Sequence, residues 1–241
     1  LVNQLAVAVV GAAEIEPRLA GVADDDADGP NLDHRLGDGL DRREQPVRRS
    51  RGFAPLPVML PVELVPTLAV GGELKSTCCL ASGRHAWVSQ HIGDMENLET
   101  VAALERSAEG FRRMYGIEPE VLAADAHPGY LSRAWAVEHA AGRPVVLVQH
   151  HHAHVAALMA EHGLDGASPV MGFAFDGTGY GIGDDGLPEM WGGEVLVADY
   201  SGFERVSHLR ALPLPGGDAA VRNPCRIAVA YLAALGIDGG D

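Results

Sequence analysis

A short apolar run that leads directly into a cluster of histidines is the feature that most constrains this chain. Residues 145–148 read Val-Val-Leu-Val, which is typical of a buried strand. Four histidines follow within five residues, at positions 150, 151, 152 and 154. An alanine-rich segment then continues to Gly163, so the pattern predicts a strand followed by a helix that a glycine terminates. In that helix His150 and His154 are four residues apart and share one face, with Cβ atoms about 5–6 Å apart.

Two imidazoles on one helix face can bind a divalent metal ion, so His150 and His154 are candidate metal ligands. The same histidines could instead be only the polar start of a helix, and the spacing alone leaves both interpretations open. The segment does not match the H-E-x-x-H pattern of zinc proteases, because His151 stands where the glutamate base would be. A hydrolase of that class is therefore disfavoured.

A second stretch that can carry chemistry follows the histidines after one helix and loop. Residues 173–181 read Phe-Ala-Phe-Asp-Gly-Thr-Gly-Tyr-Gly. They predict a strand over 170–176 that ends at the carboxylate of Asp176, and a glycine-rich turn over 177–186. Backbone amides in such a turn can face a phosphate group. We expect the rest of the chain to bring this stretch and the histidines together.

Composition narrows the possible partners. The chain has 241 residues, of which 47% are apolar, which is enough for one large domain or two small ones. Its formal net charge of -15 argues against a nucleic-acid backbone as the main partner. No run of about 18 apolar residues is present, so we expect no membrane span.

The chain start and the cysteines indicate the cellular setting. Residues 1–11 are apolar but lack a methionine and a basic segment, so they resemble the interior of a longer chain rather than a signal peptide. The three cysteines form no C-x-x-C motif and no even set, which excludes a zinc finger within the chain. A reducing, cytoplasmic compartment is the expectation.

The expected elements divide the chain into four parts. Residues 1–46 contain an aspartate-rich segment and are expected to be a poorly defined remnant or linker. Residues 47–66 are expected to be a basic and proline-rich linker. A first lobe is expected over 67–168 and an incomplete second lobe over 169–241. In the first lobe the patterns predict strands at 67–70, 74–80, 85–92, 121–125 and 145–149, and helices at 98–114, 131–141 and from the histidines onward. The second lobe is expected to have strands at 170–176, 193–198 and 204–209 and a helix at 226–235.

Several details accompany these expected elements. The first three strands are predicted to form an antiparallel meander, with turns at Gly71-Gly72 and at residues 82–84. Asp94 is the predicted N-cap of the helix that follows, and Gly116 its end. The order β-β-β-α-β-α-β-α is that of a ribonuclease-H-like α/β lobe. Two such lobes facing a cleft are the architecture of actin, heat-shock ATPases and sugar kinases.

Within that superfamily, the chain closely resembles the carbamoyltransferases of hydrogenase maturation, the HypF family. The resemblance covers residues 47–235, and it is more distant to tRNA threonylcarbamoyl transferases and antibiotic O-carbamoyltransferases. The matching stretches are Arg48–Pro55 (RRSRGFAP), Leu68–Lys75 (LAVGGELK), Ser89–Asn97 (SQHIGDMEN), Asp125–Tyr130 (DAHPGY), Gln149–His154 (QHHHAH), Phe175–Gly181 (FDGTGYG) and Leu214–Ala220 (LPGGDAA).

The resemblance implies a reaction. Upstream domains of the family, including a YrdC-like domain, would make carbamoyl-adenylate from carbamoyl phosphate and ATP. The transferase domain would pass the carbamoyl group to the C-terminal cysteine of a partner maturation protein, on the way to the cyanide ligand of nickel–iron hydrogenase. The partner supplies the thiolate, so Cys78, Cys79 and Cys225 are expected to be small packing residues.

The resemblance also implies roles for individual residues. His150, His154 and Asp176 would bind a divalent metal, Zn or Fe, that polarises oxygens of carbamoyl-adenylate. The remaining candidates would face phosphate or carbamoyl oxygens. Gly177, Thr178, Gly179 and Gly181 would do so through their backbone amides, and Lys75 would act as a point charge. Asp218 and Arg222 would reach the same oxygens from a loop that faces the cleft. Lys75 could equally be an ordinary surface lysine.

The chain departs from the family pattern at several points. Ser76 replaces the asparagine usual after Gly-Gly-Glu-Leu-Lys, and residues 1–44 barely resemble the end of a YrdC-like domain. The upstream domains and the rest of the second lobe are missing, so we expect a fragment that is inactive alone.

Three other functions stay open. An ATP-dependent phosphotransferase of the same superfamily would use the Asp-Gly-Thr-Gly segment for ATP and Asp176 for Mg²⁺ or as a base, but it has no need of paired imidazoles. A non-catalytic metal-binding remnant would keep the metal without releasing AMP. Transfer to tRNA is disfavoured by the negative charge.

Overall fold

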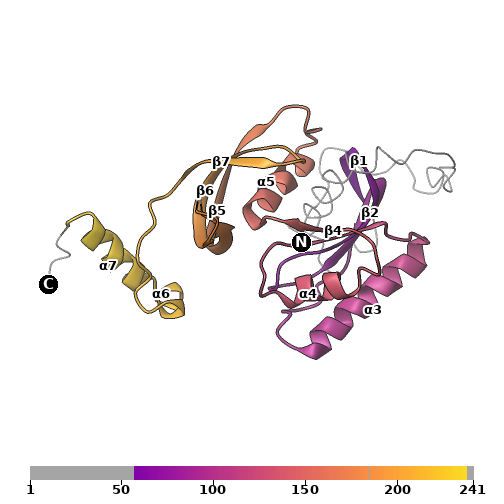
Figure 1. Cartoon of the computed structure of the whole chain (residues 1–241), viewed down its shortest axis with the longest axis horizontal. Coiled ribbons are helices and arrows are strands. Elements are labelled where there is room, and N and C mark those ends of the chain that lie inside the picture. The colour runs from indigo at the N-terminus through magenta and orange to yellow at the C-terminus, as the bar shows by residue number, and fades with distance from the viewer. Residues whose placement is uncertain (1–56, 184, 238–241) are drawn as a thin grey trace.

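A four-stranded sheet forms the larger part of the structure, a computed structural model that describes residues 57–183 and 185–237 (Figure 1). The expectations for residues 1–46, and for the linker before residue 57, lie outside the described residues. The sheet has the strand order β2-β1-β3-β4. Its strands are β1 (Val58–Val70), β2 (Cys78–Val88), β3 (Val121–Asp125) and β4 (Val145–Val148).

Crossover helices give this sheet its parallel strands. β1 and β2 form an antiparallel hairpin, and helix α3 (Leu98–Tyr115) then leads to β3, which is parallel to β1. Helix α4 (Leu131–Glu138) leads in the same way to β4, which is parallel to β3. The carboxyl ends of β1, β3 and β4 therefore meet at one edge of the sheet, where side chains that follow the strands can converge.

Alternating residues of the strands bury the two faces of the sheet in separate cores. On β3, Leu122 and Ala124 pack with residues of α3 and α4, whereas Val121 and Ala123 belong to the core that contains α5 (His150–Glu161). This alternation is the period of a strand buried on both sides. The larger α5-side core also includes Leu196 from the second sheet, so α5 lies between the two sheets.

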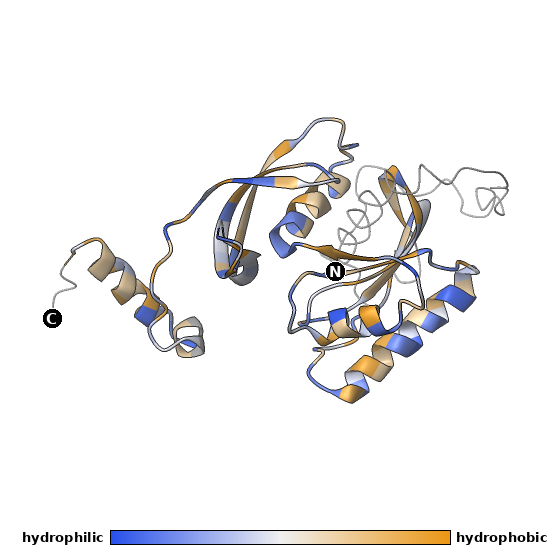
Figure 2. Cartoon of the chain, in the orientation of Figure 1, coloured by the Kyte–Doolittle hydropathy of each residue, from blue (hydrophilic) through white to orange (hydrophobic). Residues whose placement is uncertain are grey.

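The second sheet is an antiparallel meander of β5 (Val170–Ile182), β6 (Pro188–Ala198) and β7 (Phe203–His208). Gly172 on β5 allows close contact with α5, because a Cβ there would lie 2.3 Å from Val155 Cγ2. Helices α6 (Asp218–Arg222) and α7 (Pro224–Ala234) follow, and Figure 1 shows both well apart from α5. Apolar positions on α7 stay exposed, and Figure 2 shows its largely hydrophobic colouring.

Two predicted turns are wrong. Residues 82–84 lie inside β2, so the predicted three-strand meander is one long hairpin. The register of β1 against β2 shifts around the pair Leu64–Gly83, and Gly83 has φ 55°, so a bulge rather than a turn uses this glycine. Residues 177–182 likewise continue β5, whose register against β6 shifts between Phe175 and Gly179.

Several element boundaries also differ from prediction. β1 begins at Val58, and its pairing partner β2 begins only at Cys78, because Leu74 and Lys75 form a turn in which Lys75 has φ 52°. Asn97, not Asp94, caps α3: its side chain accepts a hydrogen bond from the Thr100 amide. The predicted helix over 131–141 ends earlier, at Glu138.

The predictions are confirmed where periodicity is strong. β3 has the predicted bounds, Gly116 ends α3 in the left-handed conformation, and strand β4 runs into the histidine helix. In the part of the chain that the structure describes, the helices are too short or too polar to cross a bilayer.

Candidate metal centre

Three side chains from two distant segments meet at the start of α5. One ligand atom each of His150, His154 and Asp176 lies within 4.8 Å of the other two. The rings of His150 and His154 are 4.8 Å apart and nearly perpendicular, as expected for neighbours one helical turn apart. His150 Nε2 is 3.2 Å from Asp176 Oδ2. The structure thus brings together the three predicted metal ligands.

Gln149 ties the start of the histidine helix to β5. Its side-chain oxygen accepts a hydrogen bond from the His152 amide at 2.9 Å, which caps α5. Its side-chain nitrogen donates to the carbonyl of Tyr180 at 3.0 Å. One side chain therefore fixes both the helix that carries the imidazoles and the strand that carries Asp176.

Asp125 is a functional candidate that the sequence analysis did not identify. It ends β3, its side chain is 2% exposed, and its Oδ2 lies 2.7 Å from His150 Nδ1. Its Oδ1 accepts a hydrogen bond from the His127 amide at 2.9 Å. A carboxylate that accepts from Nδ1 fixes the tautomer and ring orientation of a histidine, leaving Nε2 for a metal. The sequence does contain a signal for Asp125. It is an acidic residue at the end of an apolar strand, and the next strand along the chain leads into the histidines.

The charges around His150 favour a cation. Burial alone would lower the pKa of His150, but hydrogen bonds to Asp125 and Asp176 and the charges of both carboxylates outweigh it and raise the pKa to about 9. Burial, together with the nearby His150, lowers the pKa of His154. The raised pKa keeps His150 protonated at neutral pH without a metal, and a divalent ion would supply positive charge beside the same two carboxylates.

The donor set fits the expected metals. Two imidazole nitrogens and one carboxylate oxygen suit Zn or Fe(II), whereas Mg²⁺ prefers oxygen ligands and keeps several waters. Asp125, bonded to a ligand imidazole, is the type of outer carboxylate that accompanies histidine ligands of zinc. The residues present therefore fit a divalent transition metal.

The turn that carries Lys75 borders this cluster. A Cβ at Gly72 would lie 3.7 Å from His150 Cε1 and 3.9 Å from Asp125 Oδ2. The Lys75 side chain is exposed, and its backbone amide donates to Asp94 Oδ1 at 2.6 Å. The structure thus places Gly72, three residues before Lys75, beside the histidines.

The glycines predicted to face phosphate lie in β5 rather than in a turn. Gly177 and Thr178 belong to the shifted part of the strand. Gly179 packs against the His151 ring, where a Cβ would lie 2.3 Å from Cε1, and Gly181 packs against Trp191, where a Cβ would lie 2.2 Å from Cε2. Close packing thus explains why glycine occupies positions 179 and 181.

The segment that carries Asp218 and Arg222 lies apart from the cluster in this structure. Both belong to helix α6 rather than to the predicted loop. Figure 1 shows α6 beside α7 and far from the start of α5, and Arg222 is exposed.

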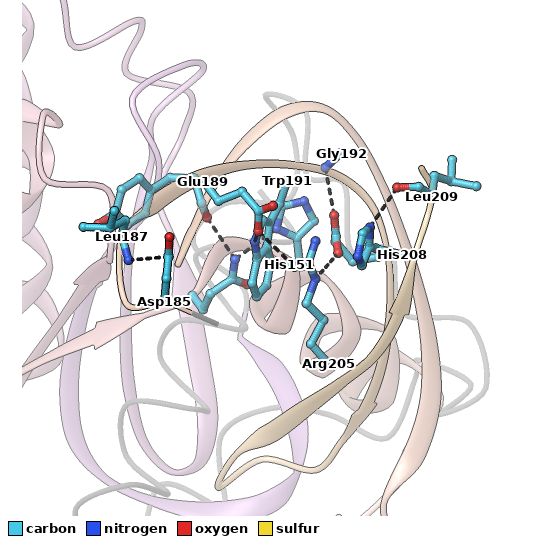
Figure 3. Close-up of polar contacts among 12 residues, drawn as sticks. His151, Asp185, Leu187, Glu189, Trp191, Gly192, Arg205, His208 and Leu209 are labelled. Atoms are coloured by element: carbon cyan, nitrogen blue, oxygen red, sulfur yellow. Dashed lines mark hydrogen bonds and ion pairs between the residues drawn. The ribbon is translucent and has the colours of Figure 1, made fainter. Parts of the chain in front are cut away.

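A charge cluster around the buried side chain of Glu194, on β6 and β7, was also not predicted (Figure 3). Arg205 on β7 places its Cζ 4.3 Å from the centre of the Trp191 ring and donates to Glu194 at 2.6 Å and to Glu189 at 3.0 Å. Trp191 Nε1 also donates to Glu189, and Glu194 is only 2% exposed. This cluster holds Trp191 against Gly181. Its members are spread over two strands, so no local sequence pattern reveals it.

Comparison with known proteins gives consistent matches. Residues 63–161 match the family model described as the HypF Kae1-like domain, and residues 172–240 match the carbamoyltransferase Kae1-like domain, second subdomain. The chain is 47% identical to carbamoyltransferase HypF2 of Cupriavidus necator over 79% of this chain and 23% of that protein. It is 42% identical to carbamoyltransferase HypF of Synechocystis over 77% of this chain and 24% of that protein.

Solved structures agree with the sequence matches. A crystal structure of full-length HypF in the phosphate- and nucleotide-bound form has a TM-score of 0.67 and 44% identity, over 77% of this chain and 24% of that one. T. kodakarensis HypF has a TM-score of 0.66 and 39% identity, over 78% of this chain and 24% of that one. The chain spans about a quarter of the length of these relatives.

Proposed function

Because the chain belongs to the HypF carbamoyltransferase family, we propose that it carries part of the carbamoyl-transfer site of such an enzyme. Its fold is the Kae1-like α/β fold, related to actin and the sugar kinases, as the sequence predicted. The donor would be carbamoyl-adenylate made from ATP and carbamoyl phosphate. The acceptor would be the C-terminal cysteine of a hydrogenase maturation partner in the cytoplasm.

The observation that supports this proposal most is the cluster of His150, His154 and Asp176 with Asp125 behind it. The two imidazoles and Asp176 would hold Zn or Fe, and Asp125 would keep His150 Nε2 directed at the ion. When bound, the ion supplies positive charge that polarises a carbonyl or phosphoryl oxygen.

Other groups of this chain would position the substrate. Backbone amides of residues 177–179 would face anionic oxygens of the donor. Lys75 would act as a point charge from its neighbouring turn. Asp218 and Arg222 are not assigned a role, because α6 lies apart from the cluster.

The cysteines of the chain fit a reaction whose nucleophile comes from the partner. Burial raises the pKa of Cys78 to about 11, which keeps the thiol protonated at neutral pH. Cys79 is also buried, and Cys225 is exposed on α7, away from the histidines. None of the three is placed to carry the carbamoyl group.

We further propose two lobes, residues 67–168 and 169–241, preceded by a remnant over 1–46 and a linker over 47–66. The isolated chain would be inactive, because adenylate synthesis and half of the nucleotide clamp would come from parts of the relatives that this chain does not span. Paired imidazoles favour transfer over the alternative of an Mg²⁺-dependent phosphotransferase.

The test is to supply carbamoyl-adenylate, metal and a peptide ending in the partner's cysteine, and to measure AMP release and the peptide's mass. We expect no turnover by the chain alone. We expect turnover when a polypeptide with the remaining transferase sequence of a relative is added, and its loss with His150→Ala. Phosphoryl transfer from ATP with Mg²⁺ alone would contradict the proposal.

A further inference from the structure

One ring nitrogen in the histidine cluster, Nε2 of His151, has no evident partner in the described part of the chain. His150 and His154 belong to the metal cluster, and His152 Nε2 donates to the carbonyl of Asp199 at 2.6 Å. His151 is fully buried, and its Nε2 has no hydrogen-bond partner among the described residues. An unpaired buried polar atom is costly, so it calls for an explanation such as a catalytic role or a bound ion.

The hydrogen bonds of Gln149 settle which ring nitrogen of His151 carries the proton. Gln149 Oε1 accepts from the His152 amide, so the amide group cannot be turned around. Gln149 Nε2 therefore faces both the Tyr180 carbonyl and His151 Nδ1, at 3.0 and 3.1 Å. An amide nitrogen can only donate, so Nδ1 of His151 accepts and the proton lies on Nε2. The atom without a partner is thus a donor.

This donor lies between the metal cluster and the irregular part of β5. The ring centres of His151 and His150 are 6.0 Å apart. On the β5 side, a Cβ at Gly179 would lie only 2.9 Å from His151 Nε2. The ring centres of His151 and Trp191 are 5.7 Å apart, so Trp191 and the Arg205 cluster around it support the His151 ring. Figure 3 shows the two side chains next to each other.

The strand beside this donor is irregular. In the pairing of β5 with β6, Phe175 lies opposite Gly193 and Gly179 lies opposite Trp191. The three residues 176–178 of β5 therefore have only Gly192 opposite them on β6. A bulge of this kind interrupts the regular ladder, and backbone amides that point out of a ladder can bind anions. Gly179, which follows the bulge, lies against His151 Nε2, so a shift of the bulge would give a ligand access to this atom.

We propose that His151 is a ligand-binding residue whose Nε2–H donates a hydrogen bond to a phosphate oxygen held beside the metal position. This inference rests on the proposed function, because the metal and the bulge amides would hold the other oxygens. It gives His151 a role as a hydrogen-bond donor rather than as a metal ligand.

Nitrogen NMR of the histidine rings tests the donor directly. We would load the ¹⁵N-labelled chain with Zn²⁺ and titrate it with inorganic phosphate. The Nε2–H tautomer of His151 is expected throughout, and its Nε2 and attached proton signals should shift with phosphate while those of His152 stay in place. An Nδ1–H tautomer, or signals that ignore bound phosphate, would overturn the inference.

Two variants separate the donor from the metal site. His151→Gln places an amide donor near the position of Nε2, and His151→Asn places one near Nδ1 instead. Phosphate affinity of the Zn-loaded protein should fall about tenfold or more in His151→Asn and recover to within about threefold in His151→Gln. Zn affinity should change little in either variant, because neither touches a ligand atom.

The outcomes distinguish the two levels of the proposal. If wild-type protein takes up Zn but all three proteins bind phosphate equally, the role of His151 is wrong and the metal site stands. If wild-type protein binds no metal, the proposed function fails and the role of His151 fails with it. Zn loss in both His151 variants would make His151 a structural support of the metal site and would also overturn its role as a donor.

Discussion

His150 Nδ1 lies 2.7 Å from Oδ2 of Asp125, which ends the neighbouring strand β3 and is almost completely buried. The contact arises because β3 and β4 are parallel and in register, with Asp125 opposite Val148. The helix that starts just beyond β4 therefore brings its first histidine over the end of β3. The sheet thus orients the candidate metal ligand before any ion binds.

Replacing this carboxylate should weaken metal binding without removing a ligand. Asp125→Asn keeps the size of the side chain but removes its charge, so Zn affinity should fall about 10–100-fold. Competition with a chelating dye measures this affinity. Asp165→Asn, at an exposed turn, is the matched control and should bind Zn as wild type does. Equal affinity in Asp125→Asn would show that Asp125 does not support the site.

The metal-free protein should lose stability as the solution becomes alkaline. The pKa of His150 is raised to about 9 in the folded state, against about 6.5 when unfolded. The charged His150 therefore stabilises the fold fully below pH 6.5, and this contribution is lost as pH rises towards and through 9. Its size is on the order of 1–3 kcal/mol. Urea unfolding between pH 6 and 10 measures it.

The control for this pH dependence is His150→Ala, which should show a flatter stability profile over the same range. Chelator-treated protein is needed for both, because a bound metal would replace the proton. A wild-type profile that rises from pH 7 to 9 would contradict the assigned pKa shift.

A methyl group at Gly179 should disturb the β5 bulge. Its Cβ would lie 2.3 Å from His151 Cε1, so the strand or the ring must move. Gly179→Ala should cost about 1–3 kcal/mol in the free energy of unfolding. Gly202→Ala is the control, because nothing lies within 4 Å of its Cβ. If both variants unfold at the same denaturant concentration, the packing described for Gly179 is wrong.

Removing the charge of Arg205 should destabilise the second sheet. Arg205→Met leaves the Glu194 carboxylate buried without its cation, which should cost about 3 kcal/mol or more. Adding Glu194→Gln should recover part of this loss, and Arg113→Met, at an exposed pair on α3, should have almost no effect. Thermal unfolding measures all of them. Equal losses for Arg205→Met and Arg113→Met would contradict the buried cluster.

The sequence predicted the elements that depend on local periodicity. β3, β4 and the histidine helix follow from apolar runs and a 3.6-residue repeat, and the helix alone places His150 and His154 on one face. The resemblance assigned Asp176 the role of third metal ligand, and no spacing rule connects this residue to a helix that ends at Glu161. The structure brings it to the histidines through the β5 bulge and the Gln149 contacts.

The predictions failed where glycine was taken to mean a turn. Gly83, Gly179 and Gly181 all lie within strands, where a bulge or a close neighbouring ring requires the missing side chain. Asp125 and Arg205 were missed for a different reason: their partners come from other strands or helices. Only the pairing of the sheets decides those contacts, and a single sequence does not display it.

The most direct test of the metal centre is elemental analysis of the purified, tag-free chain. Wild-type protein should contain about one Zn or Fe per chain, and His150→Ala/His154→Ala should contain almost none. His162→Ala, an exposed histidine at the end of the same helix, should keep the metal. A chain that is folded by circular dichroism but holds no metal, or a double variant that retains it, would contradict the account.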